Sequence, residues 1–473
     1  MSDVYVSPLS ARYAGPEMSR LFSAQFKGET FRALWIALAK AQAKLGLSIT
    51  QSQIDQMIAA QTHLDFQLIQ RYEKQFRHDV MAHIHAFGDA CPLAKPIIHL
   101  GATSSYVNDN AELIQLKEAL ALLFNKLLHL LHRLSALARQ HASEPCLGYT
   151  HFQPAQPTTI GKRIALWLQD FLWDAKEWRR IGSEMPFLGA KGATGTQSSF
   201  LALFEGNHRK VHDLEQDIAR SFGFTKVLPL SGQTYPRKLD TFLLNALASF
   251  AASAHKFATD LRLLAHEGEV LEPFSTTQVG SSAMPYKRNP IYSERICGLA
   301  RFAISLSENA SYTAATQWLE RSLDDSSNRR LAIPEAFLSI DAVLNLMHHI
   351  LEAPDIDAKS SKRHAQEALP LLCMENILME AVKRGASRQD MHETLRKLAE
   401  LTKKAQDPME ELLKALASGS QALFSRSEIL AFGDLKQLVG RAPEQTLEFL
   451  ASEVDPFLRQ HPAVSVIFAP IEY

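Results

Sequence analysis

The sequence has 473 residues, of which 46% are hydrophobic, so the chain can bury a large core, and its length predicts about three domains. Acidic and basic residues nearly cancel, at 51 against 50, which argues against nucleic acid or a membrane surface as a partner. The four cysteines show no CxxC spacing, which fits a reducing cytosol better than a disulfide framework or a zinc knuckle. Neither a secretory signal nor a run approaching the ~20 apolar residues of a membrane span is evident. We expect a soluble cytoplasmic protein.

Residues 1–105 are predicted to form an N-terminal helical domain. Apolar residues recur with a helical period over 30–45 and again over 52–60. The stretch 77–85, which contains three histidines, is also predicted to lie on a helix. A passage marked by proline and glycine, 91–105, ends this domain.

Leucines from Leu113 to Leu137 recur at alternating steps of three and four residues, which fills both seam positions of successive heptads. Leu122, Phe124 and Leu128 widen this stripe, so the helix should be packed on more than one side. Further long helical periods cover 160–181, 239–264, 291–311 and 332–351. The pattern predicts an all-α protein whose central domain, 106–353, is a long-helix bundle that joins a larger bundle in an oligomer.

The helices shorten after residue 353, and glycine and proline breaks become frequent. Asp390 follows Ser387 by three residues, a spacing that predicts a helix start. We therefore expect a third, smaller helical domain over 354–473.

Residues 280–290, called the signature loop below, lie between two long helical patterns and contain glycine, two serines and two prolines. Ser281, Ser282, Lys287 and Asn289 together form a set that can bind an anion or stabilise a developing one. A solvated basic turn is the alternative.

Two other polar loops precede bundle helices. His151 lies in the loop 149–159, and histidine is the side chain best suited to move a proton near neutral pH. Thr103 and Ser104 close the loop 99–105, where hydroxyls and free N–H groups could bind a carboxylate. In both loops the alternative is an ordinary helix cap.

These three loops, in this order on a long-helix bundle, resemble the fumarase/aspartase superfamily. The match consists of the threonine/serine loop, Thr-His-x-Gln-Pro-Ala at 150–155 and the complete Gly-Ser-Ser-x-Met-Pro-x-Lys-x-Asn at 280–289. Within the superfamily, 77–83, 231–235, 322–330 and the pair Arg12-Tyr13 are similar to the adenylosuccinate lyase branch. The similarity covers most of 5–350 and thins in the last hundred residues. Pro157 departs from the expected apolar residue.

The resemblance implies a carbon–nitrogen lyase of purine nucleotide biosynthesis. It would eliminate fumarate from adenylosuccinate, giving AMP, and from the succinyl-carboxamide ribotide SAICAR, giving AICAR, with no cofactor. By the same resemblance His151 is the general acid and Ser281 the base, with Ser282 beside it. Lys287 and Asn289 would hold the carboxylate that takes up charge, and Glu294 would orient the acid histidine.

The resemblance also implies the remaining substrate contacts. Residues expected to hold phosphate and carboxylates are Arg12, Tyr13, Arg77, Arg295, Arg321, Ser326 and Arg330. Residues expected to position the succinyl part and the base are His78, also counted as catalytic, with Asp79, Thr103, Ser104 and Gln233. The family further suggests a homotetramer with sites shared by three chains.

The heptad helix supports shared sites independently. From about 112 to 141 it has roughly 30 residues and is therefore ~45 Å long. The Thr103 loop lies before its start and His151 after its end, and the ten residues from 141 to 151 can reach back at most ~35 Å. If both loops serve one small substrate, they must come from different copies of the chain.

Three rival functions remain open. A metal hydrolase could use His78 and Asp79 with His83 and His85, although His83 and His85 should face differently on a helix. Another lyase of the superfamily could cleave argininosuccinate or malate. A member kept only as a structural protein is the third, against which intact His151, Ser281 and Lys287 argue. We expect no metal ion.

Overall fold

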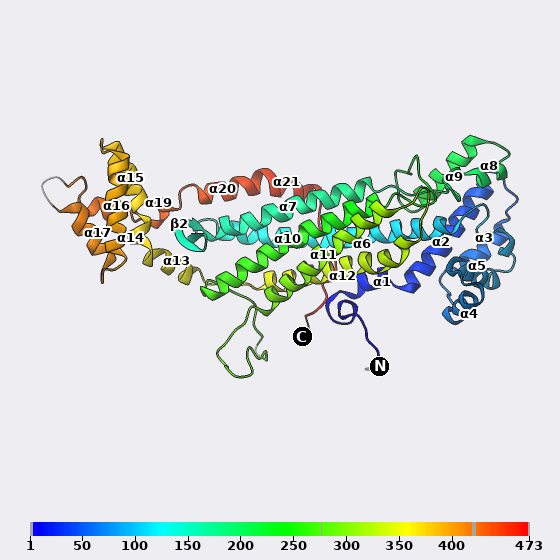
Figure 1. Ribbon diagram of the computed structural model, residues 1–473, viewed down its shortest axis with the longest axis horizontal. Helices are drawn as coiled ribbons and strands as arrows, with labels where there is room; N and C mark the ends of the chain where they lie inside the picture. The colour runs from blue at the N-terminus through cyan, green and yellow to red at the C-terminus, as the bar shows by residue number, and fades with distance from the viewer. Residues whose placement is uncertain (1–2, 276, 419–421, 472–473) are drawn as a thin grey trace.

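The computed structural model describes residues 3–275, 277–418 and 422–471, and in them five long helices run along the long axis of the molecule (Figure 1). These bundle helices are α6 (Ser104–Gln140), α7 (Ile160–Glu184), α10 (Lys238–His266), α11 (Ile291–Thr316) and α12 (Asp324–Glu352). α10 packs on α11, α11 on α12, and α6 on both α7 and α12. The predicted all-α fold with a central long-helix bundle is confirmed.

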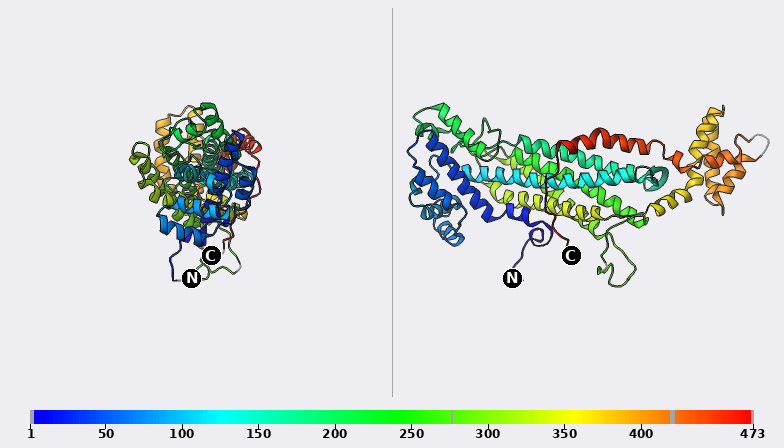
Figure 2. Two further views of the ribbon diagram at one scale, coloured as in Figure 1. Left: turned by 90° about the vertical axis from the view of Figure 1, so that its right-hand side faces the viewer. Right: turned by 180° about the vertical axis from the view of Figure 1, so that it is seen from behind.

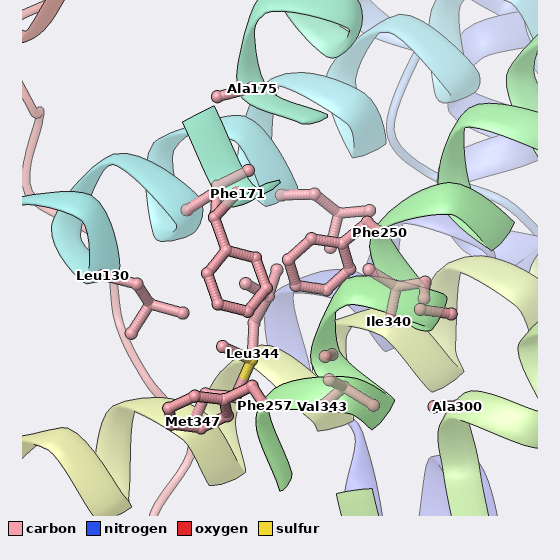
Figure 3. Packing of buried hydrophobic residues seen from close by; sticks show 14 of the residues in the cluster. Leu130, Phe171, Ala175, Phe250, Phe257, Ala300, Ile340, Val343, Leu344 and Met347 are labelled. Atoms are coloured by element: carbon pink, nitrogen blue, oxygen red, sulfur yellow. The ribbon is translucent and has the colours of Figure 1, made fainter. Parts of the chain in front are cut away.

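The centre of the bundle is a dense apolar core (Figure 3). Phe171 of α7 lies against Phe250 and Phe257 of α10, with ring centroids 5.7 and 6.0 Å apart. Leu344 and Met347 of α12 are buried in the same cluster. Truncating one of these phenyl rings to alanine would cost ~3–5 kcal/mol, because the surrounding helices cannot close the cavity.

One end of the bundle carries the N-terminal helices (Figure 1). They are α2 (Ala24–Lys44), α3 (Gln51–Ala59), α4 (Phe66–Phe76), α5 (Asp79–Ala90) and η2 (Lys95–Ile97). η1 (Leu9–Tyr13) and α1 (Pro16–Leu21) come before them and lie along the side of the bundle, where η1 packs on α12 and α1 packs on α6 and α12. α8 (Ser198–Leu203) and α9 (His208–Ser221), which follow α7, lie at the same end. Arg77 ends α4 with a φ of 51°, and His78 is the N-cap of α5. The prediction that 77–85 form one helix is therefore wrong for its first two residues, because the chain turns there.

The other end carries the C-terminal helices. They are α13 (Ala358–Glu367), α14 (Leu369–Leu372), α15 (Met374–Lys383), α16 (Arg388–Thr402), α17 (Pro408–Ala417), α18 (Arg426–Ala431) and α19 (Leu435–Leu438). Ser387 accepts a hydrogen bond from the N–H of Asp390, so the predicted start of α16 is confirmed. The chain then returns to the bundle through α20 (Ala442–Phe449), η3 (Leu450–Val454) and α21 (Asp455–Gln460), and Leu450 and Val454 join the bundle core.

The segment expected to be a polar loop before α7 is a β-hairpin. Strands β1 (Pro145–Thr150) and β2 (Gln153–Thr159) pair antiparallel, with Thr150 opposite Gln153. The two-residue turn between them is His151-Phe152, with φ of 53° and 56°, the twist that a tight hairpin needs. The prolines within β2 argue against a strand when only the sequence is considered, since proline in a sheet is confined to edge strands, strand starts and bulges. A second short pair joins β3 (Val270–Leu271) to β4 (Asp355–Ile356).

α12 begins earlier than its apolar period predicted, at Asp324 rather than near residue 332. Its first turns bury charged side chains, Asp325 and Arg329, so no apolar stripe marks them. Ser326 and Arg330 therefore lie on the helix. By length and hydropathy α12 could cross a membrane, yet 78% of its most apolar window is buried in the bundle, as expected of a core helix.

Candidate active site

The predicted site residues fall into groups at opposite ends of the bundle (Figure 1). α6 starts at Ser104 and has 37 residues, so it is ~55 Å long, more than the sequence suggested. His78, Asp79, Thr103 and Ser104 lie where α6 begins, and His151 lies beyond its end. Gln233, Arg321, Ser326 and Arg330 belong to the first end, and the signature loop, Glu294 and Arg295 to the second. Arg12 and Tyr13 are in η1, which packs on α12.

At the first end, His78 is held between α5 and α6. Its Nδ1 accepts a hydrogen bond from the N–H of Met81 at 3.3 Å, so in the neutral ring the proton is on Nε2. Nε2 lies 3.3 Å from Ser104 Oγ. Asp79 Oδ2 accepts from Arg330 Nη2 at 3.3 Å. The structure thus gathers His78, Asp79, Ser104 and Arg330 from three helices.

Side chains of α2 hold the loop before Thr103 through hydrogen bonds. Trp35 Nε1 donates to His99 Nδ1 at 2.9 Å, and Gln42 Nε2 donates to the carbonyl of Leu100 at 3.0 Å. Burial lowers the pKa of His99 to about 4, so this imidazole is neutral and can accept the indole N–H. Sequence reasoning did not single out His99, because nothing near it in the chain shows that a tryptophan lies underneath.

A buried network of ion pairs lies under Gln233 and the start of α12. Arg237 donates to Asp325 Oδ2 at 2.7 Å and to Asp109 Oδ2 at 2.9 Å, and both ion pairs are almost completely buried. Arg329 donates to Asp240 Oδ2 at 2.7 Å. Buried charges of this kind are tolerated only when each is paired.

Two predicted residues lie close to this network in the chain. The N–H of Gln233 donates to the carbonyl of Glu320 at 3.1 Å, which joins its loop to the segment before α12. Arg321 Nη1 lies 3.7 Å from Asp325 Oδ2. Sequence reasoning missed Arg237 and Arg329, because a charged residue in a sequence looks the same whether it is buried or exposed.

At the second end, the His151 hairpin is held by a fully buried carboxylate, Glu269. Its oxygens lie 3.2 Å from Arg163 Nη1, 3.0 Å from His364 Nδ1 and 3.4 Å from the hydroxyl of Tyr149. Glu269 therefore connects β1, α7 and α13 beside the exposed His151 turn. The sequence offered no signal for this role, since its partners are about a hundred residues away.

The signature loop is closed at its base and folded on itself. Glu272 accepts hydrogen bonds from the N–H groups of Tyr292 and Ser293 at 3.0 and 2.6 Å. Asn289 Nδ2 donates to the carbonyl of Gly280 at 3.0 Å. A Cβ atom on Gly280 would lie 2.0 Å from the carbonyl oxygen of Lys287, so this close approach requires glycine. The loop extends away from the bundle (Figure 1).

Within this loop Ser281 Oγ accepts two backbone hydrogen bonds, from the N–H of Ala283 at 3.3 Å and of Met284 at 3.1 Å. Two N–H groups aimed at one oxygen stabilise negative charge on it. Ser282 and Lys287 are exposed in the same loop, and Glu294 lies in the first turn of α11. The pairing of Glu294 with His151 stays a prediction.

The geometry does not support the alternative hypothesis of a metal hydrolase. The ring of His83 packs on Phe31 at 5.3 Å, and burial lowers its pKa to about 4. The ring of His85 packs on Phe76 at 4.6 Å. In the part of the chain that the structure describes, no three or more His, Cys, Asp and Glu residues are grouped closely enough to hold a metal ion.

Comparison with known proteins shows the family of the chain. Residues 12–304 match the family model described as "Lyase", and residues 370–449 match "Adenylosuccinate lyase C-terminus". The chain is 47% identical to the adenylosuccinate lyase of Schizosaccharomyces pombe, over 96% of this chain and 95% of that protein. It is 44% identical to that of Saccharomyces cerevisiae, over 97% and 96%.

A solved structure shares the fold. The 3-carboxy-cis,cis-muconate lactonizing enzyme from Pseudomonas putida has a TM-score of 0.84 to this chain, with 95% of this chain and 99% of that chain covered and 23% sequence identity. In the last hundred residues, where the motif resemblance was thin, the C-terminal family model matches as far as residue 449, and the alignments to the two yeast proteins cover 96% and 97% of the chain. The chain therefore belongs to the adenylosuccinate lyase family of the fumarase/aspartase superfamily.

Proposed function

We propose that the protein eliminates fumarate from adenylosuccinate to give AMP, and from SAICAR to give AICAR. The observation that supports this most directly is that Ser281 Oγ accepts hydrogen bonds from two backbone N–H groups inside the signature loop. A serine hydroxyl is a poor base in water, and such preorganised donors are what would stabilise its alkoxide.

The proposed reaction needs one base and one acid. The Ser281 oxygen removes a proton from the succinyl carbon next to the one bonded to nitrogen, and negative charge spreads onto the adjacent carboxylate. Lys287 and Asn289 would stabilise that carboxylate. The electron pair then forms the carbon–carbon double bond of fumarate as the carbon–nitrogen bond breaks, and His151 protonates the leaving nitrogen.

Substrate binding is proposed for the residues gathered at the first end of the bundle. His78, Asp79, Ser104 and Arg330 already contact one another at the first end of the bundle. Further residues proposed to hold phosphate, carboxylates or the succinyl part are Arg12, Tyr13, Arg77, Thr103, Gln233, Ser282, Arg295, Arg321 and Ser326. Glu294 would orient the acid.

We also propose that the active protein is a homotetramer with shared sites. Ser104 and Gln140 are the two ends of a helix ~55 Å long, which is far more than one nucleotide can span. Leu166, Trp173 and Phe242 on α7 and α10 are exposed in one chain and provide apolar surface for assembly. Four free cysteines support a cytoplasmic location.

The test is release of fumarate from adenylosuccinate, followed as a loss of ultraviolet absorbance. Argininosuccinate and malate serve as controls for the other lyases of the superfamily, which the relatives do not favour. Turnover of either control with adenylosuccinate left intact would contradict the proposal.

A further inference from the structure

A buried ion pair in the middle of the bundle serves neither group of site residues. Lys126 Nζ of α6 lies 2.6 Å from Asp341 Oδ1 of α12, and the two side chains are 1% and 0% exposed. Lys126 also donates to Asn345 Oδ1 at 2.9 Å, and Asn345 Nδ2 donates to Asp341 Oδ2 at 3.1 Å. Such a cluster is costly to bury, so its position in the core calls for an explanation.

The N-terminal segment is attached to this cluster. The N–H of Gly15 donates to Asp341 Oδ2 at 2.6 Å. A Cβ atom on Gly15 would lie 3.1 Å from the same oxygen and 3.7 Å from the Cβ of Ala469, so glycine leaves the space that this approach needs. At its other end the segment is held by Ser7 Oγ, which donates to Glu335 Oε1 of α12 at 3.1 Å.

The C-terminal tail covers the cluster from outside. We call residues 463–471 the C-terminal strap. The N–H of Ala469 donates to Asn345 Oδ1 at 3.3 Å. The ring of Phe468 stacks on His348 with centroids 3.7 Å apart, and Lys126 Nζ lies 5.5 Å from its centroid. His129 Nε2 contacts the carbonyl of Val464 at 2.8 Å. Both ends of the described chain leave the bundle on the same side (Figures 1 and 2).

Gly15 follows Tyr13 by two residues and Arg12 by three, so the strap and the cluster act on the segment that carries two proposed substrate ligands. We propose that Phe468, Lys126, Asp341 and Asn345 are positioning residues, which hold Arg12 and Tyr13 in place for substrate binding. This rests on the proposed roles of Arg12 and Tyr13. The C-terminal strap would thereby set the affinity for substrate from outside the site.

The test compares two neighbouring substitutions in the strap. Phe468→Ala removes the ring that covers Lys126 and should raise KM roughly 3- to 10-fold, the scale of a desolvated cation–aromatic contact, with kcat within about twofold of wild type. Ile467→Ala is the matched control, because this side chain is 61% exposed, and it should leave both constants unchanged. A general loss of packing would lower kcat as well.

A double-mutant cycle with Arg12→Gln shows whether the strap acts through Arg12. Arg12→Gln should raise KM, and Phe468→Ala should add little to it. If Arg12→Gln raises KM while Phe468→Ala does not, the strap inference is wrong and the proposed function is untouched. If Arg12→Gln leaves KM unchanged, Arg12 does not bind substrate, and the inference that the strap positions Arg12 is then wrong as well.

A second variant leaves the strap intact, in case Phe468→Ala does not fold. Gly15→Ala places a methyl group against Asp341 and should displace the same segment, again raising KM with little change in kcat. An unchanged KM in folded Gly15→Ala would overturn the inference.

Discussion

Ser104 Oγ lies 3.3 Å from Nε2 of His78, so the first residue of the longest bundle helix contacts the N-cap of α5. Because Nδ1 of His78 accepts the N–H of Met81, the neutral ring can only donate toward Ser104. The contact makes the orientation of His78 depend on a hydroxyl from another helix.

Replacing Ser104 by alanine should therefore lower kcat/KM about tenfold, the usual scale for losing one hydrogen bond to a polar ring. Ser104→Thr keeps the hydroxyl and should retain most of the activity. Steady-state kinetics on the two variants measures the difference. Equal activity in Ser104→Ala and wild type would mean that the contact does not matter for His78.

His151→Gln and Ser281→Ala should each lower kcat by roughly 10²-fold or more, because each removes a proposed proton-transfer group. His151 is exposed and Ser281 is only partly buried in a loop, so neither change should unfold the protein, which circular dichroism checks. His208→Gln, at an exposed histidine outside both site groups, is the control. If Ser281→Ala keeps most of its kcat, Ser281 is not the base.

Two inactive variants should restore activity to each other. His78→Gln and His151→Gln change groups at opposite ends of α6, so a shared site can draw the intact residue from different chains. Random mixing of equal amounts predicts that about a quarter of the sites recover, under conditions that let subunits exchange. Mixtures that stay inactive after demonstrated exchange would contradict shared sites.

Prolonged dialysis against EDTA should leave activity unchanged, because the proposed elimination uses only protein acid and base. Atomic absorption on the dialysed sample verifies metal removal. A loss of activity that Zn²⁺ or Mn²⁺ restores would favour the metal-dependent alternative to the proposed elimination.

The contribution of two partly buried histidines to stability should be lost as the pH is lowered from about 6.5 to about 4. Burial lowers the pKa of both His83 and His99 from 6.5 to about 4 in the folded protein. Between these values the two rings bind more protons in the unfolded chain than in the folded one, so their contribution to the free energy of unfolding is greatest above pH 6.5 and decreases as the pH falls. Chemical denaturation at several pH values measures the slope.

His99→Gln should flatten this dependence, since it removes one of the two titrating rings and keeps a side-chain oxygen that can accept the Trp35 N–H. His208→Gln, at an exposed site, should leave the slope unchanged. An unaltered slope in His99→Gln would show that this ring does not titrate with a lowered pKa.

Much of the fold could be predicted because its signals are local. The leucines from Leu113 to Leu137 predicted the bundle helix α6, and the other long periods predicted its neighbours. The three polar loops were found in the same way, since each interrupts an apolar period with a short run of hydroxyl, histidine or glycine residues. The length of α6 also predicted that its two ends cannot serve one site within a chain.

Other features depended on contacts between distant residues. The hairpin at His151 was hidden by prolines, and the early start of α12 by the buried charges Asp325 and Arg329. Glu269 with His364 and Lys126 with Asp341 are pairs about a hundred or more residues apart in the chain. Helical periodicity is a property of neighbouring residues, and a sequence therefore displays it. Whether a charge is buried, and which partner compensates it, depends on the packing of helices from distant parts of the chain, and only the tertiary structure decides that.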